Sequence, residues 1–596
     1  MSPTPAKRPY SATVPEPFTG EPFQGTTIVV IHPGSAYLRL GRASDVLPVT
    51  IPHVIARRKR RSDLPHYEDP MLPGVDSQDK TPGLLDQGIE LAEDMMWACK
   101  TDTGSPWKQT LPEQTIAFNL RSQRSILDED SGVHWVNPSP QNPEVIVGEE
   151  ALYLKPNSGY NIHWPMRRGQ LNLHSGVGGS ISSVVTDLET IWTRAIQGYL
   201  EIPPKDLKHY RAVLIVPDAY NKWHVRELVN LLLTNMGFSA VFVQQEAVCA
   251  IFGAGVCTAC VVDVGDQKTA VTCVEDGIVT PNTRLCYSYG GSDITLAFYE
   301  MLRKYKFPYR ECDPRSRMDA MFLQNLKEQF CHMDLDNCKL QTQVFKVKHP
   351  QQKIWEYFLK LGDECVMAPL GVFAPELLGI VATATAAVQR QARFYADAHD
   401  PFDGDYLEQV QRRRGMKDTG GDATKQDADP ADDPSISQSQ LEDDIANDDQ
   451  SNLGSVTREA PEEQGGGEVE KVEEEQEQEQ VLALDQAIVR SIERCDSEDL
   501  KRKMLNTILV IGGGVMFQGV QQWLNYRLSA LLPPKYRQEP RDIMTEPKEG
   551  DPRTTSWKGA AVMACLDTAQ ELWIGRKEWQ HFGYRLLRER ASFLIE

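Results

Sequence analysis

The chain lacks long apolar runs, although it has 596 residues and 41% of them are hydrophobic. No stretch of about 18 consecutive apolar residues occurs, so a membrane-spanning helix is not expected. Residues 1–25 are rich in Pro, Thr and Ser and do not contain the apolar segment of a signal peptide. We therefore expect a globular protein without a membrane partner, and its length implies two or more large lobes.

Paired cysteine motifs are missing as well. The 12 cysteines are scattered along the chain. Cys257 and Cys260 form a lone Cys-x-x-Cys, without the second pair that a zinc site of this kind needs. Other cysteines, such as Cys249 and Cys273, lie in apolar runs. These features indicate reduced, buried thiols in an intracellular protein, and a redox or zinc role is the less favoured alternative.

Aromatic residues are absent from residues 421–480, and this segment carries most of the net charge of −21. It contains 20 Asp and Glu residues against 3 Lys and Arg residues, a net charge of −17 that leaves −4 for the rest of the chain. A segment of such low complexity and high charge is not expected to fold alone. We interpret it as a solubilising insertion, with contact to basic histones as the alternative.

Composition and periodicity divide the chain into four parts. Residues 1–25 are predicted to form a disordered tail, and residues 26–400 a folded part with an irregular polar insertion at about 62–142. Residues 401–480 are predicted to form an acidic disordered insertion. Order resumes at residue 481, and the second folded part ends with residue 596.

Strands and helices alternate in the folded parts, which indicates an α/β architecture. Residues 212–216 predict a buried strand, followed by a helix with Asp218 as its N-cap and Gly237 at its end. Residues 241–243 predict the next strand, and a short helix is expected from Glu246. Further helices are predicted at 183–199, 292–305, 317–333 and 481–492.

Three glycine-containing turns follow predicted strands. Two of them lie in hairpins, at 26–41 and 259–277, and the third follows the strand 507–511 and is expected to open a helix. Glycine lets backbone N–H groups approach an anion closely, and a helix N-terminus favours a phosphate. Taken singly, each turn is compatible with an ordinary surface turn. The three turns are Gly34-Ser35-Ala36, Asp263 to Lys268, and Gly512-Gly513-Gly514.

The order of these elements resembles the actin superfamily. The resemblance covers residues 26–400 and 481–596, and its most specific segments are 31–41, 161–169, 262–269 and 571–574. It implies an actin-like α/β fold, in which two duplicated ribonuclease-H-like lobes with long inserted loops surround a nucleotide cleft. It also implies ATP or ADP with Mg2+, and Asp263 as the residue that holds the metal through water. The residues that it assigns to the nucleotide are Gly34, Ser35, Ala36, Arg39, Asp263, Gly265, Asp266, Gln267, Lys268, Lys327, Glu328, Gly512, Gly513 and Gly514.

Departures from the family pattern concern catalysis. His32 stands where the family has an aspartate that organises cation-bound water, and Pro33 removes a backbone amide. Glu246 replaces the glutamine that positions the attacking water, and Gln267 replaces a turn glycine, whereas Arg39 keeps the charge of the phosphate-binding lysine. Phosphoryl transfer depends on positioned water and metal. The resemblance therefore implies nucleotide binding with little or no ATPase turnover, and an actin-fold ATPase is the alternative.

Simpler interpretations exist for some of these residues. Lys327 and Glu328 are compatible with an exposed charged pair on a helix, and Glu246 with a helix-capping acid. Trp164 and Trp557 are expected to be packing residues.

The long insertions resemble those of the nuclear actin-related branch of the family, whose members are subunits of chromatin-remodelling complexes. This implies a nuclear, non-catalytic scaffold that contributes to nucleosome and DNA binding, transcription regulation and DNA repair. It also implies docking on a helical segment of the remodelling motor, beside actin and another nuclear actin-related protein. A filament-forming protein is disfavoured because the insertions would obstruct contacts between subunits.

Five consecutive basic residues are the candidate contact to the DNA backbone. Such a run binds phosphates without reading sequence and also suits nuclear import, although a solvated loop is the common alternative. These residues are Arg57, Arg58, Lys59, Arg60 and Arg61.

Overall fold

The structure is a computed structural model of the whole chain. It describes residues 24–60, 66–76, 83–99, 107–128, 132–136, 143–156, 158–280, 282–350, 353–380, 386–388, 481–547, 550–591 and 593. The predicted N-terminal tail up to residue 23, the acidic insertion 401–480 and Arg61 lie outside the described residues.

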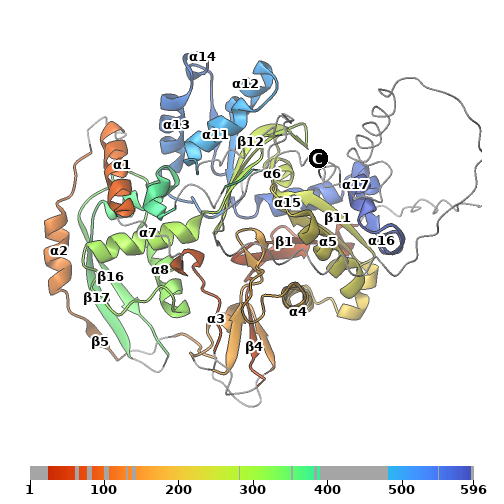
Figure 1. Cartoon of the computed structure of the whole chain (residues 1–596), viewed down its shortest axis with the longest axis horizontal. Coiled ribbons are helices and arrows are strands. Elements are labelled where there is room, and N and C mark those ends of the chain that lie inside the picture. The colour runs from red at the N-terminus through yellow and green to blue at the C-terminus, as the bar shows by residue number, and fades with distance from the viewer. Residues whose placement is uncertain are drawn as a thin grey trace, which may run out of the picture. The chain divides into compact units, whose positions relative to one another are not determined.

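Two β-sheets that share the same order over five strands form the centre of the fold (Figure 1). The first follows the order β3-β2-β1-β10-β11-β21, with strands β1 Ile28–Pro33, β2 Tyr37–Arg42, β3 Val49–Pro52, β10 Arg211–Val216, β11 Ala240–Gln245 and β21 Ile574–Gly575. The second follows the order β18-β15-β13-β12-β19-β20, with β12 Thr258–Val264, β13 Thr269–Glu275, β15 Leu285–Tyr287, β18 Ala386–Val388, β19 Thr507–Ile511 and β20 Asp542–Met544, while β14 Ile278–Val279 pairs with β13.

Each sheet is built around one antiparallel hairpin and two parallel strands. β1 pairs with β2 antiparallel and with β10 parallel, and β12 pairs in the same way with β13 and β19. The next strand, β11 or β20, is parallel in both sheets. The predicted duplication of the lobes is confirmed by this repeated order.

Two helices fill the space between the sheets, α6 Glu246–Ala254 and α15 Thr555–Ala564, which Figure 1 shows together near the centre. Val30 on β1 and Val261 on β12 face this layer, because alternate side chains of a strand point to opposite faces. α6 and α15 approach so closely that a Cβ on Gly559 would lie 1.7 Å from the carbonyl oxygen of Cys249. The loops at the carboxyl ends of β1, β12 and β19 therefore lie around one tightly packed pair of crossing helices, α6 and α15.

The outer faces of both sheets are covered by further helices. Those that pack on the first sheet are α4 Ile181–Tyr199, α5 Lys222–Asn230, α16 Arg576–Phe582 and α17 Arg585–Arg590. Those of the second lobe are α7 Gly291–Lys304, α8 Arg317–Phe330, α9 Glu364–Met367, α11 Leu484–Glu493, α12 Glu498–Asn506, α13 Val520–Leu531 and α14 Pro534–Arg537. Smaller sheets are formed by β4 Ile55–Arg58, β6 Val145–Val147 and β7 Tyr160–His163, by β8 Met166–Arg167 and β9 Gln170–Leu171, and by β16 Gln341–Val347, β17 Ile354–Leu361 and β5 Ser125–Leu127, while α3 Glu149–Leu152 follows β6.

The expectation of an irregular insertion at 62–142 was wrong for part of its length. This region contains α1 Leu84–Ala98, α2 Pro112–Arg121 and the strand β5. Ile89 and Met96 of α1 join the core of the second lobe, and the Asn119 side chain of α2 donates to the carbonyl oxygen of Lys360 at 3.2 Å. Prolines and polar residues between these elements concealed helices that are held by distant partners.

Two local predictions need correction. Asp218 does not cap α5, because Asn221 accepts from the amide of Trp223 at 2.9 Å and takes that role. Asp218 instead accepts from the amide of Ala247 at 3.1 Å, at the start of α6. The triple glycine also does not open a helix, since α13 begins only at Val520.

The other predicted helices and the two hairpins are present with shifts of a few residues at their ends. Within the described ranges, no helix combines the length and the apolar character that crossing a membrane requires.

Candidate nucleotide-binding site

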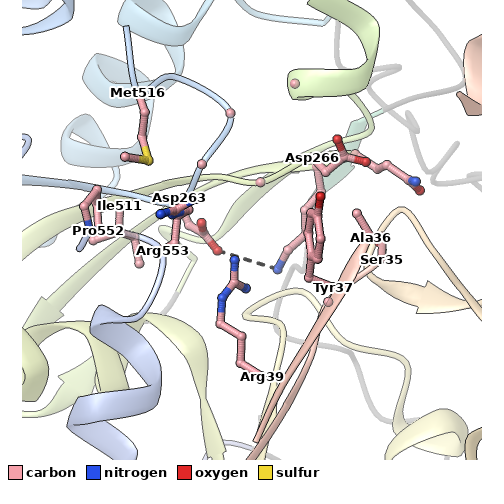
Figure 2. A pocket seen from close by; sticks show the side chains of 18 of the residues that line it. Ser35, Ala36, Tyr37, Arg39, Asp263, Asp266, Ile511, Met516, Pro552 and Arg553 are labelled. Atoms are coloured by element: carbon pink, nitrogen blue, oxygen red, sulfur yellow. Dashed lines mark ion pairs between the residues drawn. The ribbon is translucent and has the colours of Figure 1, made fainter. Parts of the chain in front are cut away.

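A cavity of about 480 Å3 lies where the turns of the two hairpins face each other, as Figure 2 shows in part. Every residue that the family resemblance assigned to the nucleotide lines this cavity. Other lining residues were not in that set, and they include His32, Tyr37, Glu246, Gln324, Met516, Phe517, Asp551 and Arg553. Ordinary surface turns would not converge in this way, so that interpretation is wrong for all three.

The first turn is shaped by the buried ring of His53. Its Nδ1 lies 2.8 Å from the carbonyl oxygen of Gly34, and its backbone amide donates to the carbonyl oxygen of Ala36 at 2.9 Å. The Ser35 hydroxyl accepts from the amide of Gly169 at 2.9 Å. Among the described residues, the amides of Ser35 and Ala36 have no hydrogen-bond acceptor and line the cavity. Two such amides in one turn suit a phosphate oxygen.

His53 is held as a neutral ring. Burial lowers the pKa of His53 to about 4. The indole Nε1 of Trp192 donates to Nε2 of His53 at 3.2 Å, so Nδ1 carries the proton and donates to Gly34. A core residue of α4 therefore fixes the first turn through one histidine.

The triple glycine packs directly on the second turn. The amide of Gly514 donates to the carbonyl oxygen of Val264 at 2.8 Å. Gly512 has φ +89°, and a Cβ there would lie 2.3 Å from the same oxygen. A Cβ on Gly514 would lie 2.3 Å from the carbonyl oxygen of Gly265. These glycines are needed for close contact between two loops, which brings the end of β19 to the cavity.

A chain of buried charges runs across the floor of the cavity. The Glu246 carboxylate contacts His32 through Oε1, at 3.1 Å from Nε2, and the ammonium of Lys268 through Oε2. The Lys268 ammonium also lies 3.9 Å from Oδ2 of Asp263. Burial alone would raise the pKa of Glu246, but Lys268 and His32 outweigh it and hold this pKa well below its usual range. Burial, followed by the charge of Glu246, raises the pKa of Asp263.

Arg39 on β2 supplies a second, half-buried cation, which points toward Asp263 in Figure 2. Its Nε is buried and, within the described part of the chain, has no hydrogen-bond partner. Burial lowers the pKa of this guanidinium, an effect that Asp263 opposes. A buried N–H group without a partner in a cavity wall indicates an anionic ligand.

The opposite wall suits a nucleoside. Lys327 is buried, and its ammonium donates to the carbonyl oxygen of Gly291 at 3.1 Å, so the interpretation as an exposed pair is wrong for this residue. Glu328, Met516 and Phe517 line the cavity together with Lys327. Together they offer the mixed polar and apolar surface that a base and a ribose need.

The basic run does not form one free cationic patch. Arg57 pairs with the buried Asp187 of α4, and Arg58 donates to the Tyr160 hydroxyl at 3.1 Å. Arg60 is exposed. Contact of this run with DNA stays a prediction, and at least Arg57 has a structural role.

Sequence reasoning missed several lining residues although their positions carried a signal. Met516 and Phe517 follow the triple glycine after one residue, Val515, and Asp551 and Arg553 precede α15. Trp557 was correctly expected to be a packing residue, because it is fully buried and donates to the carbonyl oxygen of Val30 at 3.2 Å.

A family model described as actin matches residues 23–348 and 456–592. The chain belongs to the actin family. Actin-related protein 8 of Bos taurus is 44% identical over 595 residues, which cover 96% of this chain and 93% of that protein. Actin-related protein 8 of Mus musculus is 46% identical over 96% of this chain and 93% of its own length, and that of Aedes aegypti is 41% identical over 97% and 99%.

A solved structure within the actin family is also similar, and it is described as human actin-related protein Arp8 in its ATP-bound state. The TM-score is 0.78 and the sequence identity is 42%, and the alignment covers 95% of this chain and 97% of the human chain. The predicted actin-like fold is confirmed.

Proposed function

We propose that this chain is a nuclear actin-related subunit of a chromatin-remodelling complex and that its cleft holds ATP or ADP with little or no hydrolysis. The observation that carries the proposal is the contact between His32 and Glu246 at 3.1 Å. These residues stand where the resemblance places the aspartate and the glutamine that organise water for hydrolysis. Here they bind each other, and Lys268 takes the second oxygen of Glu246. Neither side chain is then available to position an attacking water molecule.

The capacity to bind a nucleotide is supported by the rest of the cavity. Arg39 and Lys268 supply positive charge, and the Ser35 and Ala36 amides supply hydrogen-bond donors where phosphates would lie. The description of the human relative as ATP-bound agrees with this assignment. Nucleotide would fix the relative position of the two lobes, because both hairpin turns would contact the same phosphates.

Binding and hydrolysis can be separated in one experiment. Calorimetry with purified protein should show ATP binding, and steady-state phosphate release should not exceed that of a buffer blank. Asp263→Ala keeps Lys268 and its pair with Glu246, so it should still bind ATP. Sustained phosphate release by the wild type that disappears in Asp263→Ala would instead favour an actin-fold ATPase.

The partners follow from the proposed complex. We expect docking on a helical segment of the remodelling motor, beside actin and another nuclear actin-related protein, with contacts to histones and the DNA backbone. Roles in transcription regulation and DNA repair would belong to that complex. A tagged copy recovered from nuclear extract should bring actin and a remodelling motor with it. Recovery without either protein would contradict this part of the proposal.

A further inference from the structure

The Lys268 side chain lies where a divalent cation would be expected in this cleft. Its ammonium contacts Glu246 and lies 3.9 Å from Oδ2 of Asp263, so two carboxylates face one buried positive charge. The aliphatic stem is confined as well, since a Cβ on Gly169 would lie 2.9 Å from Cδ of Lys268. The positive charge at this position is therefore the Lys268 ammonium of the protein itself, with a carboxylate on either side.

The residues around this position do not fit Mg2+. Mg2+ requires close to octahedral coordination by oxygen, from carboxylates, waters and phosphates. Both oxygens of Glu246 already have partners, and Oδ2 of Asp263 faces the ammonium. His32 offers ring nitrogen in place of a carboxylate oxygen. A divalent cation beside Asp263 would also be repelled by the charge of Lys268. No group of three or more His, Cys, Asp or Glu side chains arranged to hold a metal occurs among the residues that the structure describes.

We propose that the cleft binds a nucleoside triphosphate or diphosphate without a divalent cation, and that Lys268 and Arg39 neutralise its phosphates. This inference rests on the proposed nucleotide binding, and it specifies that the ligand is the metal-free nucleotide. An ammonium has three donors, of which one is directed to Glu246, and the 3.9 Å ion pair with Asp263 is too long for a hydrogen bond, so donors are left for phosphate oxygens. Arg39 adds its buried, unpartnered Nε. The family's usual cation is thereby replaced by two side chains.

The test compares ATP binding with and without Mg2+. Calorimetric titrations of the full chain are made in excess EDTA and in excess MgCl2. ATP should bind at least as tightly in EDTA as in MgCl2, because Mg2+ adds no protein contact and only withdraws free ATP into the MgATP complex in solution. Binding that weakens about tenfold or more in EDTA would overturn the inference while leaving nucleotide binding intact. Absence of binding in both buffers would instead contradict the proposed function itself.

A substitution of Lys268 should create the metal requirement that the wild type lacks. Lys268→Met keeps the length of the stem but leaves the Glu246 and Asp263 carboxylates facing the phosphates. ATP binding in EDTA should then weaken about tenfold or more, and MgCl2 should restore most of it. Lys304→Met is the matched control, because Lys304 pairs with Asp86 on the surface. This variant should bind ATP as the wild type does. Equal binding by Lys268→Met and wild type in EDTA would overturn the inference.

Glu246→Gln provides a second variant in case Lys268→Met does not fold, which thermal unfolding will reveal. This change keeps the ammonium and removes a negative charge from the cavity floor. ATP binding in EDTA should be unchanged or tighter, with no gain from Mg2+. A new dependence of this variant on Mg2+ would contradict the role given to Lys268.

Discussion

Replacement of Gly559 by alanine tests the helix crossing on which the two lobes meet. The added Cβ would lie 1.7 Å from the carbonyl oxygen of Cys249 and 2.6 Å from the amide nitrogen of Gly253. Both atoms belong to the backbone of α6, so neither can rotate away. The helices must separate by more than an ångström, and overpacking of this kind costs about 3 kcal/mol or more. Because α6 begins at Glu246, the displacement should also reach the cavity floor.

Thermal unfolding and ATP calorimetry measure the two consequences. The unfolding midpoint of Gly559→Ala should fall by about 3 °C or more, and its ATP binding should weaken. Gly198→Ala is the control, because nothing lies within 4 Å of a Cβ at this position of α4. That change should be neutral or stabilise by up to about 1 kcal/mol. Equal unfolding midpoints for Gly559→Ala and wild type would refute the reasoning from the crossing.

Three further predictions concern other contacts of the site and the basic run. Burial lowers the pKa of His53 to about 4, so protonation at acid pH favours the unfolded chain. The contribution of His53 to the free energy of unfolding should therefore fall by about 2 kcal/mol from pH 7.5 to pH 5. A constant difference in this free energy between wild type and His53→Gln over that range would contradict the prediction. Arg57→Ala should lower the free energy of unfolding by about 3 kcal/mol, since it leaves a buried carboxylate of α4 unpaired. Arg60→Ala, at an exposed position, should leave this free energy unchanged. Equal denaturation curves for the two variants would contradict the prediction. Arg168→Ala should accelerate release of a fluorescent ATP analogue in stopped-flow experiments, because it breaks the pair at 2.6 Å that joins Arg168, beside β8, to Asp293 of α7. An unchanged rate would contradict a role of this pair in retaining the nucleotide.

The elements around the site were predictable because their signals are local. The first strand of each hairpin is a mainly apolar run, and the glycines at Gly34 and Gly265 mark the turns. The helix that ends at Gly237 has regular apolar spacing and a glycine with positive φ at its end. Each of these features needs only neighbours in sequence.

The charge network could not be predicted, because its members are brought together only by the fold. His32 and Glu246 are 214 residues apart, and sequence alone presents them as two separate departures from a family pattern. Asp218 has the spacing of a cap for the next helix, yet the fold places its carboxylate at the start of α6. α1 and α2 were hidden for a related reason, since their stability depends on packing against the distant second lobe.

The fate of ATP bound in the cleft tests the central claim most directly. Protein loaded with less than one equivalent of γ-labelled ATP is followed for both release of intact ATP and formation of free phosphate. The pairing of His32 with Glu246 predicts that nearly all the label leaves as intact ATP. Phosphate that forms faster than ATP dissociates, and whose formation Asp263→Ala abolishes, would contradict a cleft that holds nucleotide without turning it over.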